Sequence, residues 1–210
     1  MRKRRAAFTL IEVILAVALC ALVMTLVYGV LISTVQASEQ IEQITQGSEI
    51  GPAILSLMRE DLGAAFLPGT DQDYFVGQER AGRDRIDFVS SSPVYAAETP
   101  GSEPKIHSVS EIGYQVKESR EDGLVLYRRV DPFVDAEPLR GGRLIAIAPV
   151  TSFKVTYLDN GTWVPTWASS KRENKLPSSI RIELKMRLPD RSTKEGFAEK
   201  TFATVIPLAR

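Results

Sequence analysis

The feature that most constrains this chain is an uncharged apolar run near its N-terminus. Residues 13–32 hold no Asp, Glu, Lys or Arg, and most of their side chains are aliphatic. A helix of about 20 residues is about 30 Å long, which matches the hydrocarbon core of a bilayer. The run therefore predicts one membrane-spanning helix.

The residues before this run predict how the helix is oriented and processed. Four cations occupy residues 2–5, and cations next to a membrane helix are retained on the cytoplasmic side. An ordinary secretory signal has its small-residue cleavage site after the apolar region, but here Ala6 and Ala7 precede it. Cleavage after Ala7 would remove only the basic leader and leave Phe8 as the N-terminus of a retained helix. We expect everything after about Ser33 to be exported.

Charge and cysteine content exclude several classes of protein. The chain has 26 basic and 26 acidic side chains, and removal of residues 1–7 takes away four basic ones, which leaves a net charge of −4. A mildly acidic body argues against a nucleic-acid binder that relies on phosphate neutralisation.

Cys20 is the only cysteine, so an intrachain disulfide and a thiolate metal cage are both excluded. A lipoprotein signal at Cys20 is disfavoured because Leu19 precedes it, and we interpret Cys20 as an apolar filler.

Glu12 is a carboxylate beside the apolar run and needs an explanation. A charged side chain costs about 2.5–3.5 kcal/mol at the centre of a membrane helix and less near the interface, so Glu12 should have a partner. The surrounding sequence, RRAAFTLIEVILAVALCALV, resembles the prepilin signal of type IV pilins and type II secretion pseudopilins. The match combines a short basic leader, Phe8, Thr9, Glu12 at the fifth mature position and the apolar run. In that family the residue before the cut is usually Gly, whereas Ala7, the mildest replacement in size, stands here.

This resemblance implies a role for three residues. A prepilin peptidase would cut between Ala7 and Phe8, and the new N-terminal Phe8 would be N-methylated. In an assembled fibre, Glu12 would pair with the terminal amine of a neighbouring subunit. A low dielectric strengthens such a pair, while desolvation of both charges opposes it. The alternative is that Glu12 only extends toward the membrane interface.

Beyond the membrane the pattern changes from helix to strands. The helix is predicted to continue, with a kink or a break near Gly51 and Pro52 and an apolar face that packs against the following domain. This face comprises Ile50, Ile54, Leu57, Met58, Leu62 and Ala65. Alternating polar and apolar residues then predict antiparallel strands at 85–91, 110–118, 123–130, 151–159, 178–188 and 200–208.

Two connections between strands are also predicted. The turn Asp159-Asn160-Gly161 should join FKVTYL to TWVPTW as a hairpin. Residues 90–107 contain three prolines and few core candidates, which predicts an exposed loop. Five aromatic residues are expected in the sheet core or as cover of the hairpin: Tyr127, Phe153, Tyr157, Trp163 and Trp167.

The globular region extends the resemblance. The stretches GLVLYRRVDPF, GGRLIAIAPVTSFKVTYLDNGTWVPTW and LPSSIRIELKMRL are similar, in that order, to the minor pseudopilin J family of the type II secretion system. The resemblance implies an α+β pilin-like fold, in which a long N-terminal transmembrane helix packs on antiparallel β-sheet. The expected parts are a leader (1–7), a transmembrane helix (8–32), a periplasmic continuation of the helix (33–66) and a β-rich globular domain (67–210).

Residues suited to catalysis or metal binding are few. His107 is the only histidine and falls in the predicted loop, so spacing proposes neither a two-histidine metal site nor a Ser/His/Asp set. Asp71 and Asp73 could attract calcium, but no loop of spaced carboxylates follows them. A second acidic stretch is interpreted as a solvated connection, and a glycosylation sequon is explained by the hairpin turn. These residues are Asp131, Asp135 and Glu137, and Asn160-Gly161-Thr162.

The sequence and the resemblance together predict a structural, non-enzymatic subunit without cofactor or metal. The resemblance implies a single-pass protein of the bacterial inner membrane, with a cytoplasmic N-terminus and a periplasmic globular domain. Its implied partners are the I and K minor pseudopilins, with which it primes the fibre tip, the major pseudopilin, the prepilin peptidase and the inner membrane, but no nucleic acid. Glu12 fits a subunit that docks beneath or beside another, because the K member usually lacks this residue.

Two rival interpretations stay open. The first is a minor pilin of a type IV pilus or a competence system, which shares the leader and differs mainly downstream. The second is a membrane-anchored enzyme with a coincidental leader, which would need a nucleophile or a metal cluster that the sequence does not suggest.

Overall fold

The computed structural model describes residues 10–69, 72–97, 101–134, 140–189, 193 and 196–208, and the backbone alone for residues 34–48. Two compact units divide the chain, a helical unit, Met1–Gln46, and a globular unit, Gly47–Arg210.

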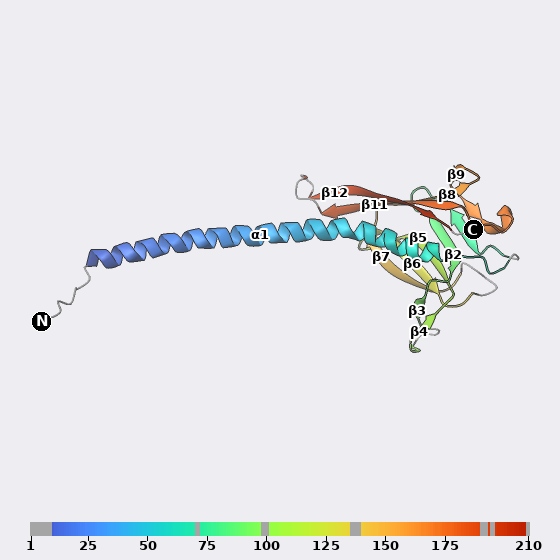
Figure 1. The fold of residues 1–210 in the computed structure, drawn as a ribbon, viewed down its shortest axis with the longest axis horizontal. Helices are drawn as coiled ribbons and strands as arrows, with labels where there is room; N and C mark the ends of the chain where they lie inside the picture. The colour runs from blue at the N-terminus through green and yellow to red at the C-terminus, as the bar shows by residue number, and fades with distance from the viewer. Residues whose placement is uncertain are drawn as a thin grey trace. The chain divides into compact units, whose positions relative to one another are not determined.

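Helix α1, Leu10–Gly63, begins in the helical unit and ends in the globular unit (Figure 1). Its segment Leu10–Ser33 has 24 residues and a mean hydropathy of 2.8, and its side chains are exposed. By length and composition this segment can cross a bilayer, which agrees with the helix predicted from the uncharged run.

The helix continues unbroken through Gly51 and Pro52, where the sequence predicted a kink or a break. Proline removes a backbone donor and is costly inside a helix, so packing must hold this turn in place. Gly51 is buried, and a Cβ at this position would overlap the ring of Phe202. The glycine that suggested a break is therefore a point of close approach between the helix and a strand.

The strands of the globular unit form three antiparallel sheets within the described residues (Figure 1). The six-stranded sheet has the order β10 (Trp167–Ala168), β1 (Phe75–Gln78), β2 (Arg85–Ser90), β5 (Ser110–Ser119), β6 (Gly123–Asp131) and β7 (Arg143–Pro149). The four-stranded sheet has the order β12 (Phe197–Pro207), β11 (Ser179–Pro189), β8 (Ser152–Asp159) and β9 (Thr162–Val164). The small sheet pairs β3 (Val94–Ala96) with β4 (Lys105–His107), and a 3-10 turn, η1 (Ser169–Arg172), follows β10.

All six predicted strands are confirmed, as β2, β5, β6, β8, β11 and β12. Strand β11 shows why the pattern was informative, since Ile180, Ile182 and Leu184 are buried while Arg181 between them is exposed. The β8–β9 hairpin is also confirmed. Its two central residues, Asn160 and Gly161, both have positive φ, 46° and 85°, as a tight hairpin requires.

The prediction of an exposed loop over residues 90–107 is wrong in part. Strands β3 and β4 pair within this stretch, and Ser90 and Val94 are buried. Three-residue strands are too short to show an alternating pattern, which is why the sequence missed them. His107 lies in β4 and is half-buried, with Nε2 3.3 Å from the carbonyl oxygen of Ala96 and its ring 6.3 Å from the ring of Phe133.

One hydrophobic core joins the end of α1 to both larger sheets. On the helix, Ile54, Met58 and Leu62 are buried as predicted, whereas Ile50 is 42% exposed and the polar Asp61 is buried. The helix therefore presents a face slightly rotated from the predicted one. The expected core or cover role of the five aromatic residues is confirmed, with Phe153, Tyr157 and Trp167 buried and Tyr127 and Trp163 half-buried.

Candidate assembly site

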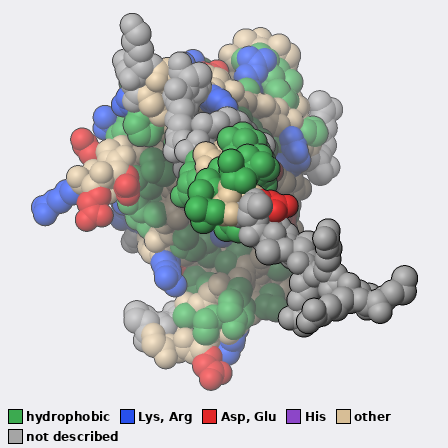
Figure 2. All heavy atoms as spheres, turned by 90° about the vertical axis from the view of Figure 1, so that its left-hand side faces the viewer, with side chains coloured by type: hydrophobic (Ala, Val, Ile, Leu, Met, Phe, Trp, Pro, Cys, Tyr) green, Lys and Arg blue, Asp and Glu red, His purple; other side chains and the backbone are tan. Residues whose placement is uncertain are grey.

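The exposed apolar surface of α1 is the first part of the candidate site. Leu10, Met24 and Val30 are 79%, 72% and 66% exposed, and Figure 2, which faces the beginning of the helix, shows hydrophobic side chains over its surface. A helix that is apolar on every side needs lipid or other apolar helices around it. This segment is therefore suited first to a membrane and then to a bundle of like helices.

Glu12 lies in the first turn of the described helix, and its side chain is exposed. It is the one charged residue of the segment Leu10–Ser33. The first turn of a helix carries a partial positive charge on its backbone N–H groups, which favours a carboxylate at this position. The other predicted site residues, Ala7 and Phe8, lie outside the described residues.

Two hydroxyl groups of the spanning segment are satisfied by the helix itself. The hydroxyl of Thr25 donates to the carbonyl of Ala21 at 2.8 Å, and that of Ser33 donates to the carbonyl of Val30 at 2.9 Å. Lipid offers no hydrogen-bond partners, so a polar group in this segment must find one within the protein. Both residues are thus compatible with a hydrocarbon environment.

In the globular unit, a buried ion pair fastens the end of α1 to the six-stranded sheet. Asp61 is 1% exposed and accepts two hydrogen bonds from Arg128 of β6, from Nε to Oδ2 at 2.7 Å and from Nη2 to Oδ1 at 2.8 Å. The hydroxyl of Tyr114, on β5, donates to Oδ2 at 2.5 Å, and Ser90 on β2 donates to the Asp61 carbonyl at 2.7 Å. Bidentate pairs of this kind are strong and directional, so they set the position of the helix on the sheet.

The surroundings of this cluster shift two pKa values. Burial raises the pKa of Tyr114 well above its usual value, and the negative charge of Asp61 raises it further. Burial alone would lower the pKa of Arg128, but the hydrogen bonds and charge of Asp61 outweigh it, so the Arg128 pKa is raised. Arg128 therefore stays charged and Tyr114 stays neutral throughout the physiological range.

The next residue of β6, Arg129, forms a second buried cluster on the opposite face of the sheet. Its Nε donates to Asp87 at 3.1 Å, its Nη2 to Glu111 at 3.0 Å and its Nη1 to the Arg140 carbonyl at 2.8 Å. Successive strand residues point to opposite faces, so two adjacent arginines serve both sides of β6. A Cβ on Gly113 would overlap the Asp87 carboxylate, which explains the glycine between these strands.

Sequence reasoning missed these ion pairs, although it noted Tyr127, Arg128 and Arg129 as part of a resemblance. The sequence nevertheless contained a signal for a buried ion pair. Asp61 lies within the predicted apolar stripe of the helix, between Met58 and Leu62, where an acidic residue requires a buried cation. Two adjacent arginines in an alternating strand were the available cations.

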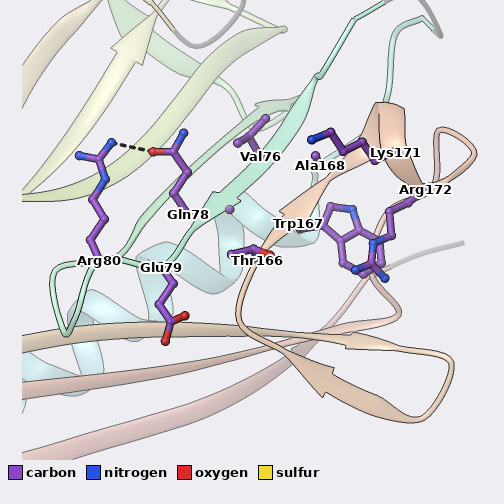
Figure 3. Close-up of a pocket in the computed structure, with 10 residues that line it drawn as sticks. Val76, Gln78, Glu79, Arg80, Thr166, Trp167, Ala168, Lys171 and Arg172 are labelled. Atoms are coloured by element: carbon purple, nitrogen blue, oxygen red, sulfur yellow. Dashed lines mark hydrogen bonds between the residues drawn. The ribbon is translucent and has the colours of Figure 1, made fainter.

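A hollow of about 730 Å3 lies beside β1, β10 and η1 (Figure 3). Two of its charged residues have partners: Arg172 pairs with Asp159 and stacks over the Trp167 ring at 4.6 Å, and Arg80 donates to Gln78 at 2.6 Å. Thr166 is the one hydroxyl residue among its described lining side chains, which include no histidine or cysteine.

Two of the predicted acidic residues, Asp73 and Asp131, accept hydrogen bonds from backbone amides. Asp73 accepts a hydrogen bond from the Ser170 amide at 2.8 Å, and Asp131 accepts one from the Phe133 amide at 3.1 Å. Among the described residues, no group of three or more His, Cys, Asp or Glu side chains is placed to hold a metal ion. Three of the predicted acids, Asp71, Asp135 and Glu137, lie outside the described residues.

Comparisons with known proteins cover both units. Residues 2–28 match the family model of the prokaryotic N-terminal methylation motif, and residues 29–192 match the model of type II secretion system protein J. The type II secretion system protein J of Xanthomonas campestris pv. campestris is 29% identical over 198 residues, which cover 88% of this chain and 89% of that protein.

Two solved structures are similar to this chain to different degrees. A type IV-like pilin from Thermus thermophilus has a TM-score of 0.52 at 15% identity and covers 79% of this chain and 95% of the pilin. A chain of the GspK–GspI–GspJ complex from enterotoxigenic Escherichia coli has a TM-score of 0.45 at 15% identity, covering 74% of this chain and 96% of that one. The pilin likeness bears on the fold alone.

The apolar N-terminal helix, the methylation motif and the antiparallel sheets define a protein of the type IV pilin-like class. The J model covers more than half of the chain, so this protein belongs to the family of type II secretion system protein J. The resemblance seen in the sequence and the predicted α+β pilin-like fold are both confirmed. The family is that of a minor pseudopilin, which is a structural subunit.

Proposed function

We propose that this chain is a subunit of the pseudopilus tip in a type II secretion system, where it primes the fibre that drives export across the outer membrane. The observation that carries the proposal is the exposed apolar segment Leu10–Ser33 of α1, which has a single carboxylate, in a chain whose folded unit belongs to the J family. Such a helix is stable in two environments, a bilayer and the helical core of a fibre, so the subunit can pass from one to the other.

The proposal includes a topology and a maturation step. The cations at residues 2–5 keep the N-terminus in the cytoplasm, and the globular unit is periplasmic. A prepilin peptidase cuts between Ala7 and Phe8, and Phe8 is then methylated. The methylation-motif match over residues 2–28 supports this processing.

Glu12 then directs assembly. The amine freed on Phe8 is a cation at the membrane surface, and in a fibre it pairs with Glu12 of a neighbouring subunit. Pairing reduces the cost of holding a carboxylate beside lipid, so the charge favours the fibre over the isolated membrane form. The partners implied by the J family are the I and K minor pseudopilins, followed by the major pseudopilin. The chain has no enzymatic role in this scheme.

Substitution of Glu12 tests the proposal. Glu12→Gln should leave membrane insertion and leader removal intact, because neither needs the charge, and should reduce both fibre entry and secretion at least tenfold. Secretion of a reporter substrate and mass spectrometry of the mature N-terminus measure the two effects. Glu49→Gln is the matched control, because Glu49 is also an exposed acid of α1, and it should secrete normally. Unchanged secretion by Glu12→Gln, or an intact leader in the wild type, contradicts the proposal.

Purification distinguishes the tip subunit from a type IV minor pilin. The full chain, coexpressed with I and K pseudopilins and extracted in detergent, should be recovered with both. Recovery as a lone monomer under these conditions contradicts a tip complex and favours the pilus interpretation.

A further inference from the structure

Three side chains of the spanning segment carry a hydroxyl group, and they differ in how that group is satisfied. The hydroxyls of Thr25 and Ser33 donate to carbonyls of their own helix, at 2.8 and 2.9 Å. Tyr28 is 63% exposed, and among the described residues its hydroxyl has no hydrogen-bond partner. Because the ring is rigid, it holds the phenol oxygen away from the carbonyls of its own helix.

The place of Tyr28 along the helix puts its phenol inside the hydrocarbon core. The middle of the segment Leu10–Ser33 lies between Ala21 and Leu22. The Cα of Tyr28 is therefore about 10 Å from the middle, whereas half of the hydrocarbon core is about 15 Å thick. Side chains of a helix lean toward its N-terminus, and for Tyr28 this direction leads toward the middle of the bilayer.

Hydrocarbon offers no acceptor to this phenol. A polar group in the core of a bilayer must be satisfied by protein, and polar side chains of membrane helices face other helices or a water-filled cavity. A tyrosine hydroxyl that is removed from water finds a hydrogen-bond partner in most proteins. Since the described residues of this chain supply none, the acceptor belongs to another chain.

The surface beside Tyr28 allows a second helix to come close. Residues three and four positions apart share a helix face, so Met24 and Thr25 lie beside the Tyr28 ring and Ala21 lies one turn further. The Ala21 side chain is a single methyl group, and the Thr25 hydroxyl is already turned toward the Ala21 carbonyl. Small side chains of this kind let the backbones of two membrane helices approach each other.

Tyr28 and Glu12 point to opposite sides of α1. They are 16 positions apart, and at about 100° per residue their directions differ by about 160°. The neighbour whose amine pairs with Glu12 in the proposed fibre therefore lies on the other side of the helix from the acceptor of Tyr28. A subunit in a fibre has neighbours on more than one side, so the two contacts are compatible.

A second copy of α1 fits poorly beside Tyr28. In a parallel pair of identical helices the same residues lie at the same level, so two Tyr28 rings would meet and hold the backbones apart. A different helix with a small residue at this level leaves room for the ring. Its acceptor can be a hydroxyl oxygen or the second lone pair of a backbone carbonyl.

We infer that the Tyr28 phenol is a contact point for the membrane helix of another pseudopilin and donates a hydrogen bond to an acceptor oxygen of that helix. The hydrogen bond removes the cost of an unpaired phenol in lipid, so it favours association of the two helices before they enter the fibre. The inference rests on the proposed function, because the partner belongs to the same assembly.

Photo-crosslinking in membranes tests which molecule lies beside Tyr28. The full chain, coexpressed with I and K pseudopilins, carries p-benzoylphenylalanine in place of Met24, which is 72% exposed on the Tyr28 face. This position should form an adduct with another pseudopilin, and mass spectrometry should map the adduct to the apolar helix of that partner. The same crosslinker in place of Leu26, 63% exposed on the opposite face, should give about fivefold less of this adduct.

Removal of single hydroxyl groups then tests the hydrogen bond. Tyr28→Phe should lower the yield of the adduct at position 24 about fivefold, while membrane insertion and leader removal stay unchanged. Thr25→Val is the matched control, because it removes a hydroxyl from the same face that is bonded to its own helix, and it should keep the wild-type yield. Equal yields from Tyr28→Phe and the wild type overturn the inference.

Other results of the crosslinking also decide the question. Adducts with lipid alone would assign Tyr28 to the membrane interface, and adducts with a second copy of this chain would assign it to self-association; both overturn the inference. Reduced secretion by Glu12→Gln in either case leaves the proposed function intact. Normal secretion by Glu12→Gln, with no pseudopilin adduct from either position, would identify the proposed function as the error.

Discussion

Glu12 and Asp61 lie on the same helix, but their surroundings give the two carboxylates different kinds of partner. Glu12 is exposed in an apolar segment suited to lipid, and its proposed partner belongs to another subunit. Asp61 is buried in the globular unit, where Arg128 and Tyr114 hold it within the same chain. The helical unit therefore depends on its environment for stability, whereas the globular unit depends on specific contacts of its own.

This comparison implies that substitutions in the helical unit and in the globular unit should change different properties of the protein. Changes in the globular unit should lower its free energy of unfolding, and changes in the helical unit should affect assembly without altering that free energy. Unfolding by urea of the full chain in detergent micelles, followed by the fluorescence of Trp163 and Trp167, measures the globular unit alone, because both tryptophans lie there.

The largest effect is expected from Arg128→Met. It leaves the Asp61 carboxylate buried without its cation, which should lower the free energy of unfolding by about 3–5 kcal/mol. The triple variant Asp61→Leu, Tyr114→Phe and Arg128→Met removes every polar member together and should recover most of the loss. A loss below about 1 kcal/mol for Arg128→Met would mean that other contacts fix the helix end.

Tyr114→Phe should have the next largest effect. The phenol donates to a charged acceptor, so its removal should cost about 1.5–3 kcal/mol at neutral pH. Because burial raises the Tyr114 pKa, this tyrosine stays neutral in the folded state when it ionises in the unfolded chain. The contribution of Tyr114 to the free energy of unfolding of the wild type should thus fall above about pH 10, by about 1.4 kcal/mol per pH unit.

The pH dependence that Tyr114 causes can be isolated by comparing the free energy of unfolding of the wild type with that of Tyr114→Phe. Burial also raises the Tyr157 pKa, but Tyr157 is present in both proteins, so its contribution cancels. The stability gap between wild type and Tyr114→Phe should therefore narrow above about pH 10. A gap that stays constant across this range would contradict the assigned environment of Tyr114.

Alanine substitutions of two glycines of α1 compare the packing of its two parts. Gly51→Ala should destabilise the globular unit by about 1–3 kcal/mol, because the added methyl group overlaps the Phe202 ring. Gly29→Ala should leave the unfolding free energy unchanged, since nothing outside its own helix lies within 4 Å of the added carbon. Equal effects of the two substitutions would mean that the two parts of the helix do not differ in packing.

The smallest effect is expected from Thr25→Val. Its hydroxyl bonds only to its own helix, at the Ala21 carbonyl, so the globular unit should keep its stability within about 0.5 kcal/mol. A larger change in the urea midpoint would show that the helical unit contributes to the stability of the globular unit.

The sequence predicted those elements whose formation depends on neighbouring residues. A run of residues without charge is enough to predict a spanning helix, and alternation along a strand is enough to predict β11, because neighbouring residues alone produce both patterns. The resemblance of the leader to prepilin signals likewise depends on a short contiguous stretch, and the methylation-motif match covers the same stretch.

Tertiary structure decided whatever depends on residues far apart in the chain. Arg128 and Asp61 are 67 positions apart, and Gly51 meets Phe202 from the last strand, so no local pattern could pair them. The same holds for the edge position of β7, which follows from the order of strands in the sheet and not from its own seven residues. By itself the sequence determined the apolar helix, six of the strands and the β8–β9 hairpin, because neighbouring residues produce each of these patterns. Long-range packing decided which charges meet, where α1 approaches a strand at Gly51, and which strands lie at the edges of the sheets.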